Sequence, residues 1–137
     1  MSKRSVSDSY LMKLWRRAVL INFNNTCPIC GHQGAEDLQC HHVVFRRHAI
    51  LRYDWRNGIP LCNVYHVGNQ RFGGKTCHQY GHTRSGEQAI RNHVDMAYLE
   101  RMELLQIKDY ILTAGMSRNE FLTKMADDLK KKIEQGY

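Results

Sequence analysis

The pattern of hydrophobic and polar positions divides the chain into a helical start, an irregular middle and a helical end. Near the N-terminus, apolar residues recur at helical spacing. They are Leu11, Leu14, Trp15, Ala18 and Val19. Lys13, Arg16 and Arg17 lie off this stripe, so we expect an amphipathic helix with a basic outer face over residues 9–21. Its expected N-cap is Asp8 or Ser9.

The last part of the chain, from about Glu87 to Tyr137, is expected to be helical again. Gly115 interrupts this stretch, and Ser117 with Glu120 forms the capping-box pattern that starts a new helix. Apolar residues spaced four apart, with Leu122 beside them, give that helix one packing face. They are Phe121, Met125, Leu129 and Ile133.

The middle of the chain, from about Phe23 to Arg84, holds both prolines and most of the glycines, which predicts loops and short strands. The histidine doublet His41-His42 lies in a β-branched and aromatic context, before Val-Val-Phe, that is typical of a strand. Adjacent residues on a strand point in opposite directions. We therefore expect the two histidines to face opposite sides of the strand.

The charge balance of the chain indicates the kind of partner to expect. Twenty Lys and Arg residues oppose thirteen Asp and Glu residues, for a formal net charge of +7, which favours a polyanion such as nucleic acid. A chain of 137 residues suits one domain, which a bound metal would help to stabilise. No apolar stretch is long enough to span a membrane, and no apolar signal core follows the basic N-terminus. We expect a cytoplasmic protein with no membrane partner.

The cysteines indicate zinc. There are five of them, an odd number that rules out a complete disulfide framework, and the Cys27-x-x-Cys30 spacing is that of a zinc knuckle. Tetrahedral zinc needs two more ligands, for which Cys62 and Cys77 are the candidates. Fourteen residues separate these two, so we interpret the segment between them as an inserted loop. We interpret Cys40 as a buried strand thiol.

The histidines indicate a second metal. His78 and His82, separated by three residues, would occupy one face of a helix and could bind one ion together. In the doublet, one histidine can hold a metal while its neighbour activates water, as in-line cleavage of a phosphodiester requires. The pattern therefore predicts metal-assisted chemistry on nucleic acid.

This order of residues resembles the HNH nucleases, and it is also similar to small HNH proteins common in phage genomes. The resemblance covers residues 27–84 and includes Asn57, which follows the doublet after fourteen intervening residues. It implies an α+β fold: a ββα-metal (HNH) core, a hairpin followed by a helix with one divalent ion between them, with a structural zinc site. We expect this core over residues 27–86, an N-terminal helix in residues 1–26 and a C-terminal helical extension in residues 87–137.

The resemblance also implies roles for individual residues. His41, His78 and His82 would hold a catalytic divalent ion (Mg²⁺, Mn²⁺, Ni²⁺ or Zn²⁺). His42 would be the general base, and Asn57 would hold it in its productive orientation. The structural Zn²⁺ would be bound by Cys27, Cys30, Cys62 and Cys77. An arginine would steady the scissile phosphate, and the candidates are Arg46, Arg47, Arg52 and Arg56.

The inserted loop leaves an alternative for the metal ligands. His66 lies where the first helical ligand would fall without an insertion, but its partner position holds Gln70, so we favour His78 and His82. The loop itself is either a flap that touches DNA or a passive surface loop.

The expected function is that of a metal-dependent HNH endonuclease that cuts or nicks DNA, with RNA as an alternative substrate. One rival is a non-catalytic, zinc-stabilised module that binds nucleic acid. Another is a zinc-stabilised domain that binds proteins through its C-terminal helices.

Overall fold

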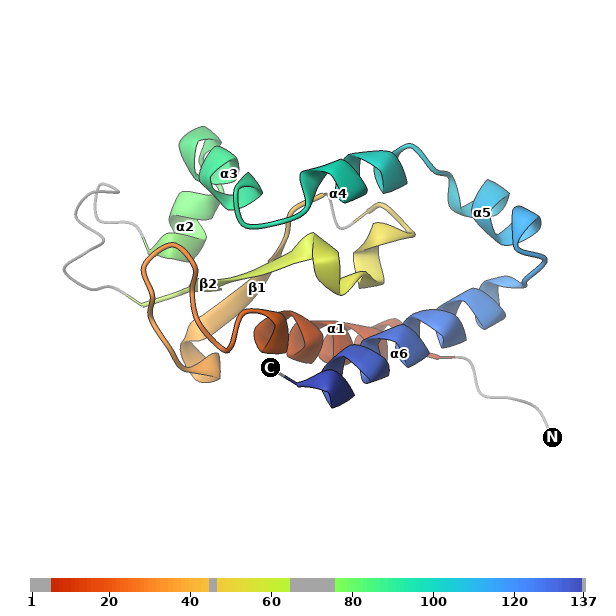
Figure 1. The fold of residues 1–137 in the computed structure, drawn as a ribbon, viewed down its shortest axis with the longest axis horizontal. Coiled ribbons are helices and arrows are strands. Elements are labelled where there is room, and N and C mark those ends of the chain that lie inside the picture. Colours follow the sequence, from red (N-terminus) through yellow and green to blue (C-terminus); the bar gives the residue numbers. More distant parts are fainter. Residues whose placement is uncertain (1–5, 45–46, 65–75, 137) are drawn as a thin grey trace.

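The computed structural model describes residues 6–44, 47–64 and 76–136, which form a mixed α+β fold (Figure 1). In these residues a two-stranded antiparallel sheet combines with six α-helices. The helices and strands are α1 (Asp8–Asn22), β1 (Leu38–His42), β2 (Gly58–Cys62), α2 (Cys77–Gly81), α3 (Arg84–Arg91), α4 (Met96–Glu103), α5 (Ile107–Thr113) and α6 (Arg118–Gln135). Short 3-10 turns precede the strands: η1 (Ala35–Asp37), η2 (Leu51–Tyr53) and η3 (Trp55–Asn57).

Helix α1 has the predicted amphipathic character. The five residues of its apolar stripe are buried, and the three basic residues of its outer face are exposed. The N-cap differs from the prediction. Ser7, not Asp8 or Ser9, accepts a hydrogen bond from the backbone N–H of Tyr10 at 3.1 Å, because the helix begins one residue earlier than the apolar periodicity suggests.

The sheet brings the histidine doublet opposite the start of β2. His41 pairs with Ile59 and His42 with Gly58 in the antiparallel register. Helix α1 packs against both strands, and a Cβ atom added at Gly58 would overlap the side chains of Val19 and Trp15. The glycine thus lets α1 approach the hairpin closely, and this approach places Trp15 beside the doublet.

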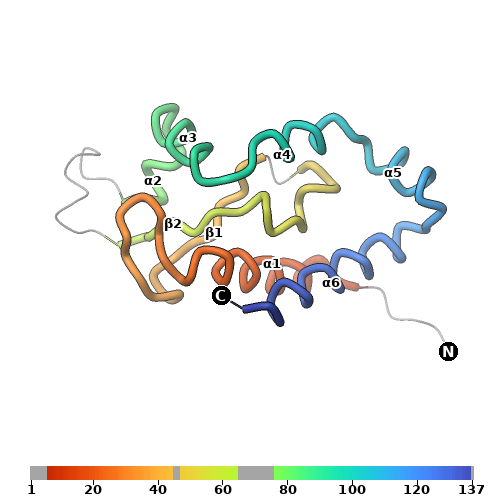
Figure 2. The backbone as a smooth tube through the Cα atoms, in the orientation of Figure 1, coloured from red at the N-terminus to blue at the C-terminus, as the bar shows by residue number. Residues whose placement is uncertain are grey.

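The C-terminal helices return the chain to α1. Helix α6 packs along α1 (Figures 1 and 2) and buries Phe121, Met125 and Leu129 against it. The predicted break and capping box are confirmed: Gly115 has φ +66°, and Ser117 and Glu120 exchange both hydrogen bonds of the box. The helical region begins at Arg84, three residues before the predicted start, because Thr83 caps α3 through the N–H of Gly86.

The core has two main clusters of buried side chains. One lies between α1 and α6, and the other surrounds the cysteines between β1, β2 and α3. Helix α1 contributes to both, because Leu20 belongs to the second cluster while the residues before it belong to the first. No helix among the described residues is long and apolar enough to cross a membrane.

Candidate metal centre

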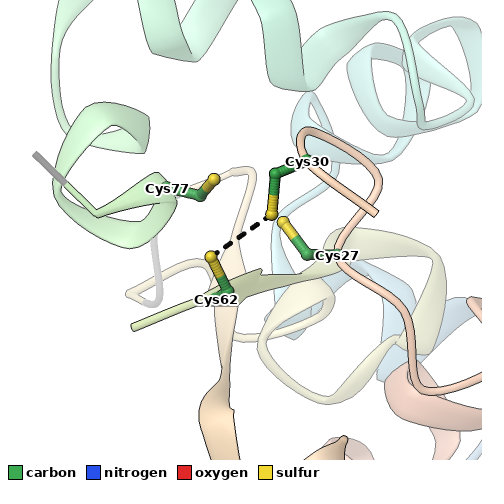
Figure 3. Close-up of side chains that lie close together, drawn as sticks. All are labelled: Cys27, Cys30, Cys62 and Cys77. Atoms are coloured by element: carbon green, nitrogen blue, oxygen red, sulfur yellow. Dashed lines mark hydrogen bonds between the residues drawn. The ribbon is translucent and has the colours of Figure 1, made fainter. Parts of the chain in front are cut away.

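Four cysteines converge from three parts of the chain. Cys27 and Cys30 come from the loop after α1, Cys62 from the end of β2 and Cys77 from the start of α2 (Figure 3). Their sulfur atoms all lie within 4.8 Å of one another. In tetrahedral zinc–thiolate sites, sulfur atoms about 2.3 Å from the ion are about 3.8 Å apart, so the cluster has the dimensions of such a site.

The cysteines are thiols rather than disulfides. The Sγ atoms of Cys30 and Cys62 lie 3.4 Å apart, well beyond the ~2.05 Å of a disulfide bond. Burial raises the pKa of the Cys30 thiol to about 11 and also raises the pKa of Cys77. Burial opposes ionisation of Cys62 too, but hydrogen bonds from Cys30 and Cys77 outweigh it and lower the pKa of Cys62. A cation among the sulfurs would offset these costs of ionisation, so the donor set fits Zn²⁺.

A second cluster consists of three histidines. His41 lies on β1, His78 on α2, and His82 is the C-cap of α2. Their ligating nitrogen atoms lie within 4.8 Å of one another. Helix α2 is short, but Thr76 and Gln79 form a complete capping box at its start, which fixes the turn that carries Cys77 and His78. The T-x-x-Q pattern was a sequence signal for this helix start that we did not use.

Burial and neighbouring histidines favour the metal-binding form of His41 and His78. Burial, together with His82, His78 and His42 nearby, lowers the pKa of His41 to about 4. Burial and His82 also lower the pKa of His78. A neutral imidazole offers a lone pair to a cation, so the three histidines could hold a metal such as zinc.

His42 lies apart from this cluster, and its contacts include a ring stack and a hydrogen bond. Its ring stacks on the ring of Trp15, with centroids 3.9 Å apart and planes 4° from parallel. Its Nε2 lies 3.0 Å from the carbonyl oxygen of Arg52. A carbonyl oxygen only accepts hydrogen bonds, so Nε2 carries the proton and Nδ1 holds the lone pair of the neutral ring.

We predicted that Asn57 holds His42 in its orientation; the hydrogen bonds of its side chain join it to the backbone of Val44 and Leu51. Its side chain is fully buried, and its amide accepts from the N–H of Val44 at 2.6 Å and donates to the carbonyl oxygens of Val44 and Leu51 at 3.1 Å each. Leu51 precedes the residue whose carbonyl binds His42, and Val44 follows the doublet. Asn57 thus ties together two backbone segments near His42, one two residues after it and one next to the carbonyl group that it contacts.

The four candidate arginines have different surroundings. Arg52 forms a bidentate ion pair with Asp8 at 2.7 and 2.8 Å. The guanidinium of Arg56 lies over the rings of Trp55 and Tyr98, at 4.9 and 4.8 Å from their centroids. Arg47 is exposed, and Arg46 lies outside the described residues. Two of the four therefore bind partners within the protein.

A cavity of about 330 Å³ connects the histidine cluster with His42. His41, His42 and His82 line it from one side, and residues of α3 and α4 line it from the other. Four thiolates would close the coordination shell of the first metal, whereas three imidazoles leave a position open, as in catalytic zinc sites. The open cavity beside the histidines is where such a position would be used.

The remaining sequence predictions have mixed outcomes. Cys40 lies on β1 outside the cysteine cluster, as expected, although its side chain is only half-buried. The alternative ligand His66, the position of its missing partner (Gln70) and most of the inserted loop lie outside the described residues. The stacking of Trp15 on His42 was missed, because a helical stripe identifies a buried tryptophan but not its neighbour in space.

Comparisons of the chain with protein families, curated proteins and solved structures gave no match.

Proposed function

We propose that this protein is a metal-dependent endonuclease of the ββα-metal (HNH) kind that hydrolyses phosphodiester bonds of DNA. The observation that carries the proposal is the cavity shared by His42, His41 and His82. A side chain suited to accept a proton lies at the same cavity as side chains suited to hold a cation. The chain order β1, β2, α2 and the net charge of +7 also support it.

The two clusters would hold different ions. The four cysteines would bind a structural zinc, and the three histidines would bind a catalytic divalent ion. Such an ion supplies positive charge that polarises a phosphate oxygen and stabilises the leaving oxygen. His41, with its pKa lowered to about 4, stays neutral and available as a ligand at physiological pH.

His42 would act as the general base. Its Nδ1 accepts a proton from water, the water oxygen attacks phosphorus, and the bond from phosphorus to the leaving oxygen breaks. The leaving oxygen then takes a proton from solvent. The Arg52 carbonyl keeps the other ring proton on Nε2, and the Trp15 stack restricts the ring to one plane. Both contacts reduce the reorganisation needed at the moment of reaction.

The test combines metal analysis with a nicking assay. Purified protein is incubated with supercoiled plasmid and with Mg²⁺, Mn²⁺, Ni²⁺ or Zn²⁺ in turn, and RNA serves as the comparison substrate. We expect tightly bound zinc and nicked or linear plasmid with at least one ion. A folded, zinc-containing protein that binds plasmid but cleaves it with none of these ions would overturn the proposal in favour of a non-catalytic binding module. A protein with no affinity for DNA at low salt would instead favour the protein-binding alternative.

A further inference from the structure

His42 lines two cavities, not one. The first is the cavity of about 330 Å³ shared with the histidine cluster, with α3 and α4 on its far side. The second measures about 380 Å³ and lies between α1 and β1. It is lined by Met12, Trp15, Arg16, Gln39, Cys40 and His42. A substrate can therefore reach His42 from either of two sides, and Figure 1 shows α1 and α3–α4 on opposite sides of the hairpin.

The lining of the first cavity is acidic. Glu87, Glu100 and Glu103 line the first cavity, against one cation, Arg91. All four of these residues are exposed. Three carboxylates against one guanidinium repel phosphate groups that enter this cavity.

The α1 side is basic. Arg16 lines the second cavity, and Lys13 and Arg17 are exposed neighbours on the same helix face, spaced three and four residues apart as on one side of a helix. The acidic residue of α1, Asp8, is engaged by Arg52 in a bidentate ion pair. The outer face of α1 therefore presents three positive charges, of which Arg16 lines the same cavity as His42.

Arg16 is held in place for such a contact. Its Nη2 donates to the carbonyl oxygens of Ala35 at 2.9 Å and Leu38 at 3.2 Å. These bonds fix the guanidinium alongside β1 and leave the N–H groups on Nε and Nη1 for an anion. A guanidinium held before the ligand arrives loses less entropy on binding than a mobile one.

The arginines suggested by the sequence fit this task less well. Arg52 and Arg56 bind Asp8 and two aromatic rings, respectively. Arg47 lines a separate cavity with Asp8 and Arg52, and that cavity includes neither His42 nor the histidine cluster.

We propose that the phosphodiester backbone of the substrate reaches His42 over the outer face of α1, where Lys13, Arg16 and Arg17 contact phosphates beside the one that is cleaved. The scissile phosphate would extend past His42 to the histidine cluster at the first cavity, whose three carboxylates disfavour entry of the flanking phosphates. This assignment rests on the proposed nuclease function and adds to it the path of the substrate.

The first test measures binding and its dependence on salt. Full-length, zinc-loaded His42→Ala protein binds a fluorescent DNA duplex without cutting it, and anisotropy gives Kd at several salt concentrations. In this background, Lys13→Gln, Arg16→Gln and Arg17→Gln together should weaken binding by ~10-fold or more. They should also reduce the slope of log K against log salt by about 1 for each lost phosphate contact.

The matched control removes three positive charges elsewhere. Lys108, Arg118 and Lys131 are exposed residues of α5 and α6, so changing them to Gln alters the net charge equally. An α1 variant with the same salt slope as this control would overturn the role of α1. Circular dichroism and zinc content confirm that both variants are folded.

The second test changes the acidic side. Glu87→Gln, Glu100→Gln and Glu103→Gln together should tighten DNA binding severalfold at low salt, because repulsion is removed. Unchanged or weaker binding would overturn the repulsion by these carboxylates.

Plasmid nicking by the wild-type protein separates the two proposals. A protein that never cleaves overturns the nuclease function, whereas one that cleaves but ignores the α1 substitutions overturns the substrate path alone.

Discussion

The adjacent histidines His41 and His42 on β1 have different surroundings, which suit the two roles proposed for them. The alternation of a strand turns His41 towards α2 and the other histidines, while His42 lies against Trp15 of α1. In the proposed mechanism, His41 would share a cation and His42 would exchange a proton. The two histidines are consecutive in the chain, and both line the same cavity.

The first prediction concerns His42. His42→Ala should lower the rate of plasmid nicking by about 100-fold or more, the usual contribution of a general base. Metal content should stay unchanged, because His42 lies outside both ligand clusters. His93→Ala, which removes an exposed histidine at the end of α3, is the matched control and should nick at the wild-type rate. Near-wild-type nicking by His42→Ala would show that another group activates the water.

The second prediction concerns Asn57. Asn57→Ala removes three hydrogen bonds of a fully buried amide and leaves their backbone partners unsatisfied. We expect the free energy of unfolding to fall by about 3 kcal/mol, as measured by urea denaturation. Nicking should fall as well, because the two backbone segments near His42 loosen. A variant of unchanged stability that has lost activity would instead indicate direct contact between Asn57 and His42.

For individual residues, the sequence identifies candidate metal ligands better than it identifies which side chains will contact one another in the fold. The spacing of the cysteines and histidines singled out the seven residues that come together in the two clusters. The pairing of Arg52 with Asp8 across 44 positions and the stack of Trp15 on His42 depend on tertiary packing, which leaves no local pattern. The basic face of α1 was visible in the sequence, but its place beside His42 was not.

Among the secondary-structure elements, the contact between α1 and β2 does most to shape the candidate site. Gly58 lies opposite His42 in the sheet, and the absence of a side chain there admits the rings and methyl groups of α1. Helical periodicity predicted the buried face of α1 correctly. The distance between α1 and the sheet depends on Gly58, and the sequence alone does not show that α1 packs against this glycine.

The third prediction tests this contact. In Gly58→Ala the new Cβ would lie 2.8 Å from Cζ2 of Trp15 and closer still to Val19. The backbone at Gly58 is extended, with φ −136°, so any cost comes from packing, and we expect about 1–3 kcal/mol of lost stability.

A double-mutant cycle provides the check. Val19→Ala makes room for the added methyl group, so the double variant should be less destabilised than the sum of the two single variants. Nicking by Gly58→Ala should also fall, because Trp15 moves relative to His42. Strictly additive losses in stability would show that α1 does not press on Gly58.

The whole molecule depends on α1 as a shared element. Both main core clusters contain α1 residues, and the first of them is completed by α6, at the opposite end of the chain. The sequence predicted helices at both ends and a centre with the cysteines and histidines of two metal sites, and the structure has helices at both ends and two clusters there that could hold metal ions. It did not predict that the terminal helices pack on each other, because amphipathic faces show that a helix has a partner but not which one.

The last prediction follows from this shared helix. Structural-zinc affinity is folding free energy, and a helix of 15 residues is marginal in water by itself. Removing zinc with a chelator, or through Cys62→Ser, should therefore disorder the cysteine cluster and weaken the packing of α6 on α1. We expect zinc release, measured with a metal-sensitive dye, and loss of helical circular dichroism to share one thermal transition. Cys40→Ser, which changes the cysteine outside the cluster, should keep its zinc and show the same single transition. Zinc release well below the temperature at which helicity is lost would mean that α1 and α6 fold without the metal centre.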